Sequence, residues 1–132
     1  MTTPHAPALL KAPAEHPDNA AFWQATREGR LLLRHCDDCA KPHWYPRTLC
    51  PFCIGTTNWR PASGRGTIYS YSVTRRAGPT PFCIAYVKLD EGPTMLTQIV
   101  DCDLDTVRIG QKVLLRFSPS DGGAPLPTFT LA

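Results

Sequence analysis

Two Cys-x-x-Cys pairs constrain this chain more than any other feature: Cys36 with Cys39, and Cys50 with Cys53. Each pair forms a tight turn that directs two sulfur atoms at one point, and ten residues separate the pairs. This separation is shorter than the roughly 15–20 residues common in metal ribbons, but it is long enough for a two-stranded excursion. Zn²⁺ accepts four thiolates in a tetrahedron at about 2.3 Å. The sequence therefore predicts a structural metal ribbon that holds zinc, with iron as an alternative on the same ligands.

Redox and catalytic roles fit these thiols less well. A thioredoxin-like site has one Cys-x-x-Cys pair at the start of a helix, whereas here two pairs lie beside Pro42 and Pro51. We expect no membrane span and no secretory signal, and therefore a cytoplasmic protein in which structural disulfides are rare. A catalytic zinc keeps one position open for water, but four thiolates close the shell and leave no place for His35 or His43. The metal is expected to brace the fold, so function lies elsewhere in the chain.

Composition and pattern divide the chain into three parts. With 14 prolines and 9 glycines in 132 residues, short strands and turns are expected instead of long helices. Residues 1–18 are predicted to be a flexible Pro-rich tail. Residues 19–62 are predicted to hold an N-terminal helix, from Ala20 to Glu28 with Gly29 after it, followed by the ribbon.

Residues 63–132 are predicted to form a five-stranded barrel. Period-2 alternation or short apolar runs mark strands at 67–74, 82–89, 94–100, 113–117 and 126–131, and the segment 90–93 has the composition of a hairpin turn. In the first strand the alternation places Tyr69, Tyr71 and Val73 on one face. Five short strands without a long helix indicate a mainly β fold with a barrel of the OB type.

Two features suggest binding surfaces. Phe22 and Trp23 are adjacent in the predicted helix and point about 100° apart, so either the helix packs on its own domain or one aromatic side chain awaits a partner. The net charge is +3, but the segment from residue 60 to residue 88 contains only cations among its charged residues: Arg60, Arg65, Arg75, Arg76 and Lys88. Such a strip suits an anionic partner such as a phosphate-bearing cofactor or RNA, and a solvated face is the alternative.

Motifs of an autonomous enzyme are missing from the sequence. All four histidines lie in the tail or the ribbon, so no Ser/His/Asp set can be proposed. Cys83 is expected to be buried and inert in a strand, and Asp101 and Asp103 are expected to raise the pKa of Cys102 between them. The acidic run 101–105 lacks the glycine and glutamate that a calcium loop requires at its sixth and twelfth positions, where Thr106 and Lys112 stand.

Several segments in this order resemble the DUF35 family. They are FWQATREGRLLLRHCDDCAKPHWYPRTLCPFC (22–53), GRGTIYSYSV (64–73), IGQKVLLRF (109–117) and LPTFTL (126–131), and the resemblance covers roughly residues 19–131. It implies an N-terminal helix, a rubredoxin-like zinc ribbon whose ligands are the four paired cysteines, and an OB-fold. It also implies an accessory role beside a thiolase-like or ketoacyl-synthase-like protein, which carries the catalytic residues while the small subunit helps to shape the acyl-CoA channel.

The residues agree with this implication. The phosphates of CoA would meet Arg65, Arg75, Arg76 and Lys88, and a separate partner chain would contact Phe22 and Trp23. A nucleic-acid-binding module is the alternative, because OB barrels bind single strands on stacking aromatic side chains, here Tyr69, Tyr71, Phe82 and Tyr86. The near balance of acids and bases disfavours it.

Overall fold

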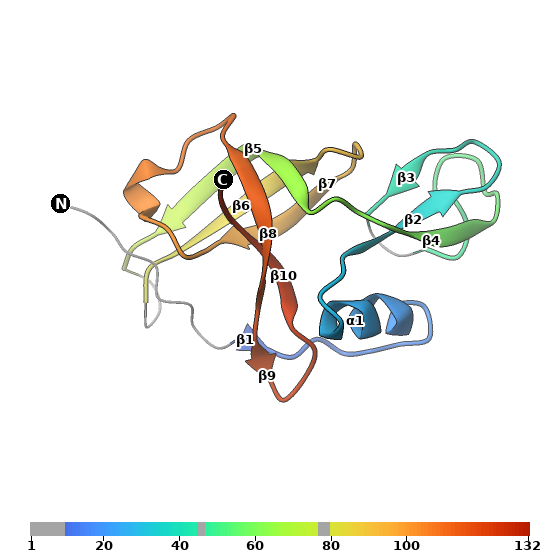
Figure 1. The fold of residues 1–132 in the computed structure, drawn as a ribbon, viewed down its shortest axis with the longest axis horizontal. Helices are drawn as coiled ribbons and strands as arrows, with labels where there is room; N and C mark the ends of the chain where they lie inside the picture. Colours follow the sequence, from blue (N-terminus) through green and yellow to red (C-terminus); the bar gives the residue numbers. More distant parts are fainter. Residues whose placement is uncertain (1–9, 45–46, 77–79) are drawn as a thin grey trace.

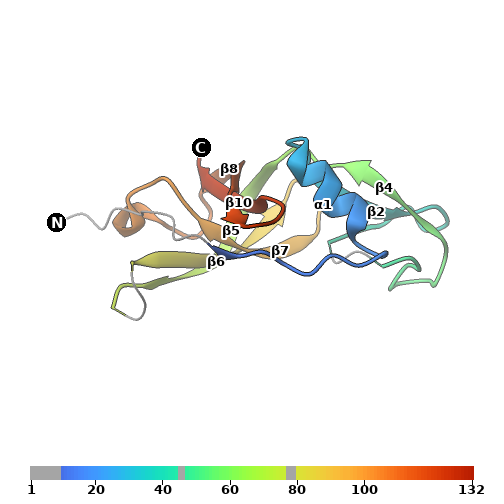
Figure 2. The same ribbon diagram turned by 90° about the horizontal axis from the view of Figure 1, so that it is seen from below.

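The computed structural model describes residues 10–44, 47–76 and 80–132. A closed five-stranded barrel forms one end of an elongated molecule, and a small three-stranded sheet forms the other (Figures 1 and 2). The single α-helix of the described chain lies between them. The architecture confirms the prediction of a mainly β protein with an N-terminal helix, a ribbon and an OB-type barrel.

The barrel contains its strands in the order β10-β7-β6-β5-β8. Neighbours are antiparallel except for β10 and β7, which are parallel and meet at the pair Phe129 and Ile99. Side chains alternate inward and outward along β6 and β7, so every second residue is buried. The bounds are β5 (Arg65–Thr74), β6 (Phe82–Leu89), β7 (Thr94–Ile99), β8 (Lys112–Ser118) and β10 (Leu126–Leu131), with a 3₁₀ turn η1 (Leu104–Thr106) before β8.

A β-bulge at Tyr69 changes the predicted faces of β5. Ile68 pairs with Val87 and Ser70 pairs with Tyr86, so Tyr69 is an extra residue without a partner on β6. The bulge places Ile68 inside the barrel and leaves Tyr69 67% exposed, although Tyr71 packs against the core as the alternation predicts. The expectation that Tyr69 shares a face with Tyr71 is therefore wrong, because one inserted residue reverses the alternation.

The ribbon is a sheet with the order β3-β2-β4. β2 (Leu32–Cys36) pairs in antiparallel fashion with β3 (Pro42–His43) and β4 (Thr57–Pro61). Of the described residues from 36 to 61, the buried ones are Cys36, His43 and Cys50. The ribbon therefore has almost no apolar core of its own.

Helix α1 (Ala20–Arg27) joins the two ends of the molecule. It ends at Glu28, and Gly29 follows with φ +77°, a conformation that glycine adopts without strain. The helix buries Phe22, Ala25 and Thr26. Phe22 and Ala25 belong to one hydrophobic cluster with Leu31–Leu33 and the interior of the barrel, so a continuous core links the predicted domains.

The segment before the helix contacts the rest of the molecule. β1 (Leu10–Lys11) pairs in parallel with β9 (Ser120–Asp121), and Glu15 forms an ion pair with Arg27 at 2.6 Å. This part of the predicted tail is therefore not free, and residues 1–9 lie outside the described residues. A two-residue strand has no periodic pattern by which the sequence could reveal it.

Candidate functional site

The two cysteine pairs form knuckles of the same local structure. In the first, the N–H of Cys36 donates to the carbonyl of Lys41 at 3.1 Å, and in the second the N–H of Cys50 donates to the carbonyl of Gly55 at 2.8 Å. The residue after each pair has a positive φ, 60° at Ala40 and 65° at Ile54. Both turns therefore reverse the chain in the same way, and both direct their sulfur atoms to one point.

The sulfur atoms lie at the spacing that a tetrahedral metal requires. All four lie within 4.8 Å of one another, with Cys36 and Cys53 at 3.5 Å and Cys39 and Cys50 at 3.7 Å. Four sulfurs around one zinc ion would be about 3.8 Å apart, given Zn–S bonds of about 2.3 Å. All six cysteines of the chain are free, so the close approach is not a disulfide. The predicted ligand set is therefore assembled, and its soft, charged donors fit a structural divalent metal.

Backbone N–H groups surround the thiols and favour their ionised form. The N–H groups of Asp38 and Cys39 donate to the sulfur of Cys36 at 3.3 and 3.4 Å, and that of Phe52 donates to the sulfur of Cys50 at 3.3 Å. Burial alone would raise the pKa of Cys50, but N–H donors and neighbouring thiols lower this pKa to about 7. The N–H of Gly55 lowers the pKa of Cys53, yet contact with the other thiols and burial outweigh it and raise this pKa to about 12. Four adjacent thiols do not all ionise by themselves, and a bound cation removes this conflict.

The histidines of the ribbon lie outside the ligand cluster. His43 is 6% exposed, and its two ring nitrogens have no hydrogen-bond partner among the described residues. His35 borders a cavity of about 320 Å³ between the ribbon and the β6–β7 turn, where Arg60 and Glu91 also lie. The sequence gives no sign that His35 approaches Glu91, because the two residues belong to separate predicted domains. The described residues that line this cavity include no serine, threonine or cysteine, so they provide no hydroxyl or thiol nucleophile.

The basic strip of the sequence is divided in the fold. Arg65 begins β5, whereas Arg75 and Arg76 follow its end. Nine to ten residues of extended strand separate these positions by roughly 30 Å. Arg75 forms an ion pair with Asp105 at 2.6 Å. The four cations predicted to bind phosphate therefore lie at two opposite ends of the barrel.

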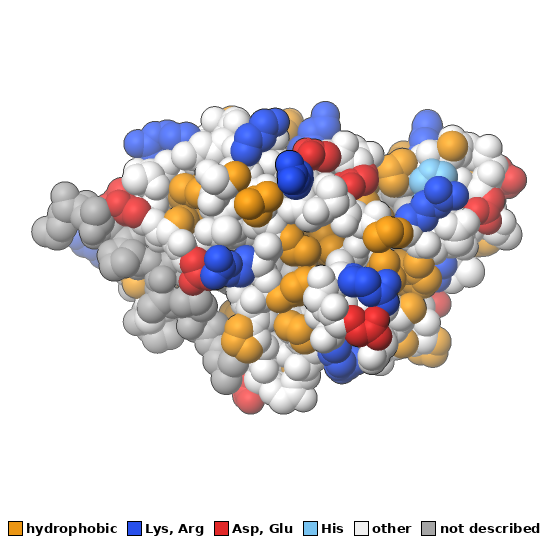
Figure 3. Space-filling view, in the orientation of Figure 1, with side chains coloured by type: hydrophobic (Ala, Val, Ile, Leu, Met, Phe, Trp, Pro, Cys, Tyr) orange, Lys and Arg blue, Asp and Glu red, His pale blue; other side chains and the backbone are white. Residues whose placement is uncertain are grey.

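One of these ends gathers more cations than the sequence suggests. Thr67 of β5 pairs with Lys88 of β6 on one side and with Lys112 of β8 on the other, and Lys112 Nζ donates to Thr67 Oγ1 at 3.1 Å. Arg65 precedes Thr67 by two residues and shares its outer face. Figure 3 shows Lys and Arg side chains along the upper edge of the molecule with Asp or Glu side chains beside them, and Asp90 lines one cavity together with Arg65 and Lys112. We name Arg65, Lys88 and Lys112 the cationic cluster. Lys112 was missed because β8 is distant in sequence from the basic strip.

The two predicted docking residues differ in exposure. Phe22 is 3% exposed, and its ring lies 4.9 Å from that of Trp23, 5.3 Å from that of Trp44 and 6.4 Å from that of Trp59. Trp23 is half-buried, and its Nε1 is buried without a hydrogen-bond partner among the described residues. The helix thus packs on its own domain through Phe22, and only Trp23 retains surface that a partner could reach.

The remaining motifs are structural. Cys83 is fully buried, and burial with the nearby Cys102 raises its pKa to about 11. Burial and then the charges of Asp103 and Asp101 raise the pKa of Cys102, in the predicted direction. In the acidic run, Asp101 pairs with Arg116 at 3.1 Å and Asp103 caps η1. These thiols are poor nucleophiles, and the acids hold local structure.

Known proteins match both the ribbon and the barrel of this chain. The family model of the ChsH2 rubredoxin-like zinc ribbon domain matches residues 23–60, and that of the ChsH2 C-terminal OB-fold domain matches residues 59–118. A DUF35 domain-containing scaffold protein of Methanocaldococcus jannaschii is 33% identical over 99 residues, which are 69% of this chain and 70% of that protein. The chain belongs to the DUF35 family. The resemblance inferred from the sequence is confirmed, and the ribbon of this DUF35 protein is a zinc ribbon with its four cysteines in place.

Two further relatives are named as parts of enzymes. A solved structure of the Ltp2–ChsH2(DUF35) aldolase matches with a TM-score of 0.79 and 31% identity, covering 90% of this chain and 98% of that chain. A probable enoyl-CoA hydratase alpha subunit of Thermomonospora curvata is 34% identical over 128 residues, which are 92% of this chain. The DUF35 protein spans only 40% of the length of that hydratase subunit. No helix of its described residues is long and apolar enough to cross a membrane.

Proposed function

We propose that this DUF35 protein is a non-catalytic scaffold subunit that docks on a thiolase-like or ketoacyl-synthase-like enzyme acting on acyl-CoA. The match to the aldolase structure carries this proposal, because nearly the whole of that chain superposes on this one. Thiolase, aldolase and acyltransferase reactions all fit such a partner. The free cysteines suit a reducing compartment, and we place the protein in the cytoplasm.

The proposed absence of catalysis rests on the surroundings of the candidate nucleophiles. Cys83 and Cys102 have raised pKa values, and four thiolates would leave the metal without an open position. A nucleophile needs a base within hydrogen-bond reach. In the described chain, no histidine is bonded to a serine, threonine or cysteine side chain. We assign zinc to the cysteines as a brace that gives the ribbon its folded shape.

For the CoA ester shared with the partner, we assign the phosphates to the cationic cluster. Arg65 and Lys88 were predicted for this role, and Lys112 extends the set across three adjacent strands. Charge-assisted hydrogen bonds to one phosphate require donors that lie close together. Arg75 and Arg76 lie at the other end of β5, so they cannot bind the same phosphate as the cationic cluster. Lys88→Ala with Lys112→Ala should raise the KM of the complex for acyl-CoA while kcat stays constant. Arg76→Ala is the matched control, and an equal effect there would contradict the assignment.

Copurification tests the function itself. Tagged DUF35 protein, expressed together with the thiolase-like protein encoded beside it, should be isolated as a stable complex. The isolated small subunit should show no thiolase, hydrolase or transferase activity, and the partner should need it for full activity or solubility. Activity of the small subunit alone, or the absence of any acyl-CoA enzyme from the purified material, would contradict the proposal.

Nucleic-acid binding is the second candidate. It is supported by the OB barrel and by Tyr69 and Tyr86, which are 67% and 47% exposed. Only a few cations lie near these rings, so we expect no more than nonspecific affinity for single strands at physiological salt. Tight binding with a steep salt dependence would reverse the order of the two candidates.

A further inference from the structure

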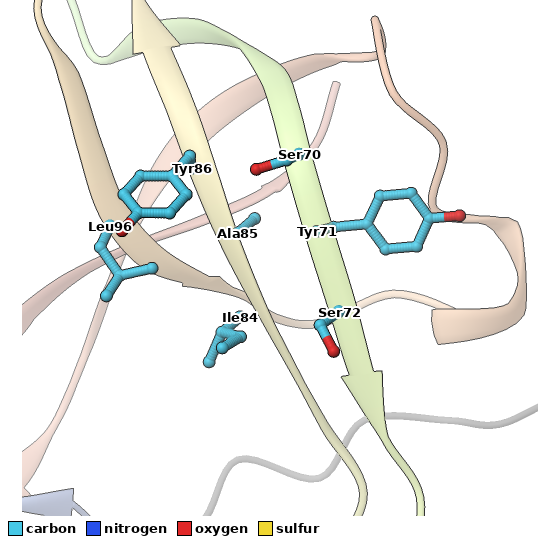
Figure 4. A pocket seen from close by; sticks show the side chains of 7 residues that line it. All are labelled: Ser70, Tyr71, Ser72, Ile84, Ala85, Tyr86 and Leu96. Atoms are coloured by element: carbon cyan, nitrogen blue, oxygen red, sulfur yellow. The ribbon is translucent and has the colours of Figure 1, made fainter.

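The outer surface of β6 and β7 is apolar where solvent-exposed strands are usually polar. Ile84 and Tyr86 of β6 are 39% and 47% exposed, and Leu96 of β7 is 53% exposed. Tyr86 pairs directly with Leu96 across the two strands, and their side chains lie side by side in Figure 4. Tyr71 points to the opposite side of the sheet in the same view. We name Ile84, Tyr86 and Leu96 the β6–β7 face.

Uncharged polar residues frame this face. Ser70 pairs with Tyr86, Ser72 pairs with Ile84, and Gln98 pairs with Ile84 on the other side. A shallow cavity of about 150 Å³ lies over the face, and the part of the chain that the structure describes contributes no charged residue to its lining. Lys88 follows Tyr86 by two residues on the same outer side of β6, so the one charge on this side of the strand is positive.

The face continues into a groove beside the helix. A cavity of about 340 Å³ shares Ile84 and Leu96 with the face and extends between Trp23, Trp44 and Leu126. Among the described residues, none that lines this groove has a charged side chain. The buried Nε1 of Trp23 is a donor without an acceptor among the described residues. A buried donor of this kind is costly unless it is paired, so a ligand that supplies an oxygen would satisfy it.

We propose that the β6–β7 face and the adjoining groove receive the catalytic subunit through an apolar protein surface. This inference rests on the proposed function and names the surface that performs it. The flat face is covered by apolar side chains of the partner, and a projecting segment fills the groove and offers a carbonyl or carboxylate oxygen to Trp23. Aromatic side chains in such pockets contribute most of the binding energy in many interfaces.

Charge selects this occupant over two others. OB-folds bind oligonucleotides on the face of their second and third strands, which are β6 and β7 here, but the cationic cluster lies at one end of this side and the described residues that line the face carry no charge to follow a phosphate chain. A second copy laid face to face would bring a second Lys88 to the same interface, and like charges disfavour that arrangement. Apolar patches on monomers reach about 300–600 Å², and a stable interface takes about 800 Å² from each partner. The face alone is therefore too small for a stable interface, and the groove must contribute area as well. A partner that fills the groove needs a protruding apolar segment.

The test compares two exposed aliphatic residues of the barrel in the full chain. Leu96→Glu places a carboxylate in the middle of the face, and Ile109→Glu makes the same change at a residue that is 68% exposed and lies outside it. The probe is the thiolase-like protein that copurifies with the wild-type chain, titrated without CoA. Leu96→Glu should weaken its Kd at least 30-fold, and Ile109→Glu should change it less than 3-fold. Zinc content and circular dichroism verify that both variants are folded.

The outcomes separate this inference from the proposed function. A wild-type Kd for folded Leu96→Glu, or an equal loss in Ile109→Glu, overturns the assignment while the complex itself stands. If the wild-type chain binds no acyl-CoA enzyme, both proposals fail. A wild-type homodimer that Leu96→Glu dissociates would assign the face to a second copy, and loss of single-stranded RNA binding would assign it to nucleic acid.

Discussion

The ribbon and the barrel are stabilised by different interactions. Between residues 36 and 61, the described residues with buried side chains are Cys36, His43 and Cys50. The barrel instead buries Ile68, Val87, Met95 and Phe129 among a larger apolar set. The hydrophobic effect therefore stabilises the barrel directly, whereas the ribbon depends on one metal and on its contact with α1. A region with almost no hydrophobic core can thus be folded if four metal ligands and contact with a helix stabilise it.

Removing the metal should produce the largest difference between the two regions. Chelation, or Cys36→Ser, should unfold residues 36–61 because structural zinc contributes about 10–16 kcal/mol of apparent binding free energy to such ribbons. The barrel should remain folded. Hydrogen exchange followed by mass spectrometry checks this, with Cys102→Ser, at a partly exposed position outside the ligand cluster, as the control cysteine variant that keeps one zinc. Simultaneous loss of protection in the barrel would show that the two regions are one cooperative unit.

Phe22→Ala tests the connection between the regions. The ring is buried against Trp23, Trp44 and Trp59, so its loss should lower the free energy of unfolding by about 3–5 kcal/mol. Urea denaturation followed by tryptophan fluorescence measures this loss, and Gln24→Ala on the exposed side of α1 is the control. If Phe22→Ala keeps its stability but no longer binds the partner protein, Phe22 is a docking residue after all.

Gly66→Ala should affect the barrel alone. A Cβ at this position would lie 2.6 Å from Val87 Cγ1 and 2.9 Å from the carbonyl oxygen of Lys88. Overpacking of this kind costs about 1–3 kcal/mol. Thermal unfolding should detect the loss, while zinc content stays at one per chain and the exposed Ser72→Ala shows almost no effect. Release of zinc from Gly66→Ala would mean that the strain reaches the ribbon.

The smallest effect concerns pH and the ribbon. Burial, followed by the charges of Arg34 and Arg47, lowers the pKa of His43 below 6.5, although a backbone contact at Arg47 opposes the shift. The folded state therefore binds this proton less readily, and the stability that His43 contributes above pH 6.5 is lost as the pH falls through the lowered pKa. His43→Gln should reduce the slope of stability against pH below 6.5, because glutamine does not take up a proton in this range. Chemical denaturation at pH 7.5 and 5.5 measures it, and identical slopes would exclude His43 as the cause.

The sequence predicted local features well, but it predicted poorly which distant segments of the chain lie next to each other in the fold. The cysteine pairs, the β6–β7 hairpin and the helix are each determined by neighbouring residues, and their positions are confirmed. The bulge at Tyr69, the pairing of Leu10 with Ser120 and the approach of Lys112 to Lys88 depend on contacts between distant segments. The residue types of β5 also keep their apparent two-residue alternation across the bulge, so they do not reveal the inserted residue. The four clustered cysteines were thus predicted because one motif contains them, whereas the approach of Lys112 to Lys88 was missed because the barrel brings three strands together.

The parallel pairing of β10 with β7, at Phe129 and Ile99, has a consequence for the order of folding. The barrel closes only when β10, the last strand, reaches both β7 and β8. Contacts between residues far apart in sequence form slowly, because a long loop must close before they are made. The two knuckles need only a short loop and an available ion. During synthesis the ribbon is therefore expected to bind its metal before β10 has been translated. The ribbon would then be folded while the barrel is still open.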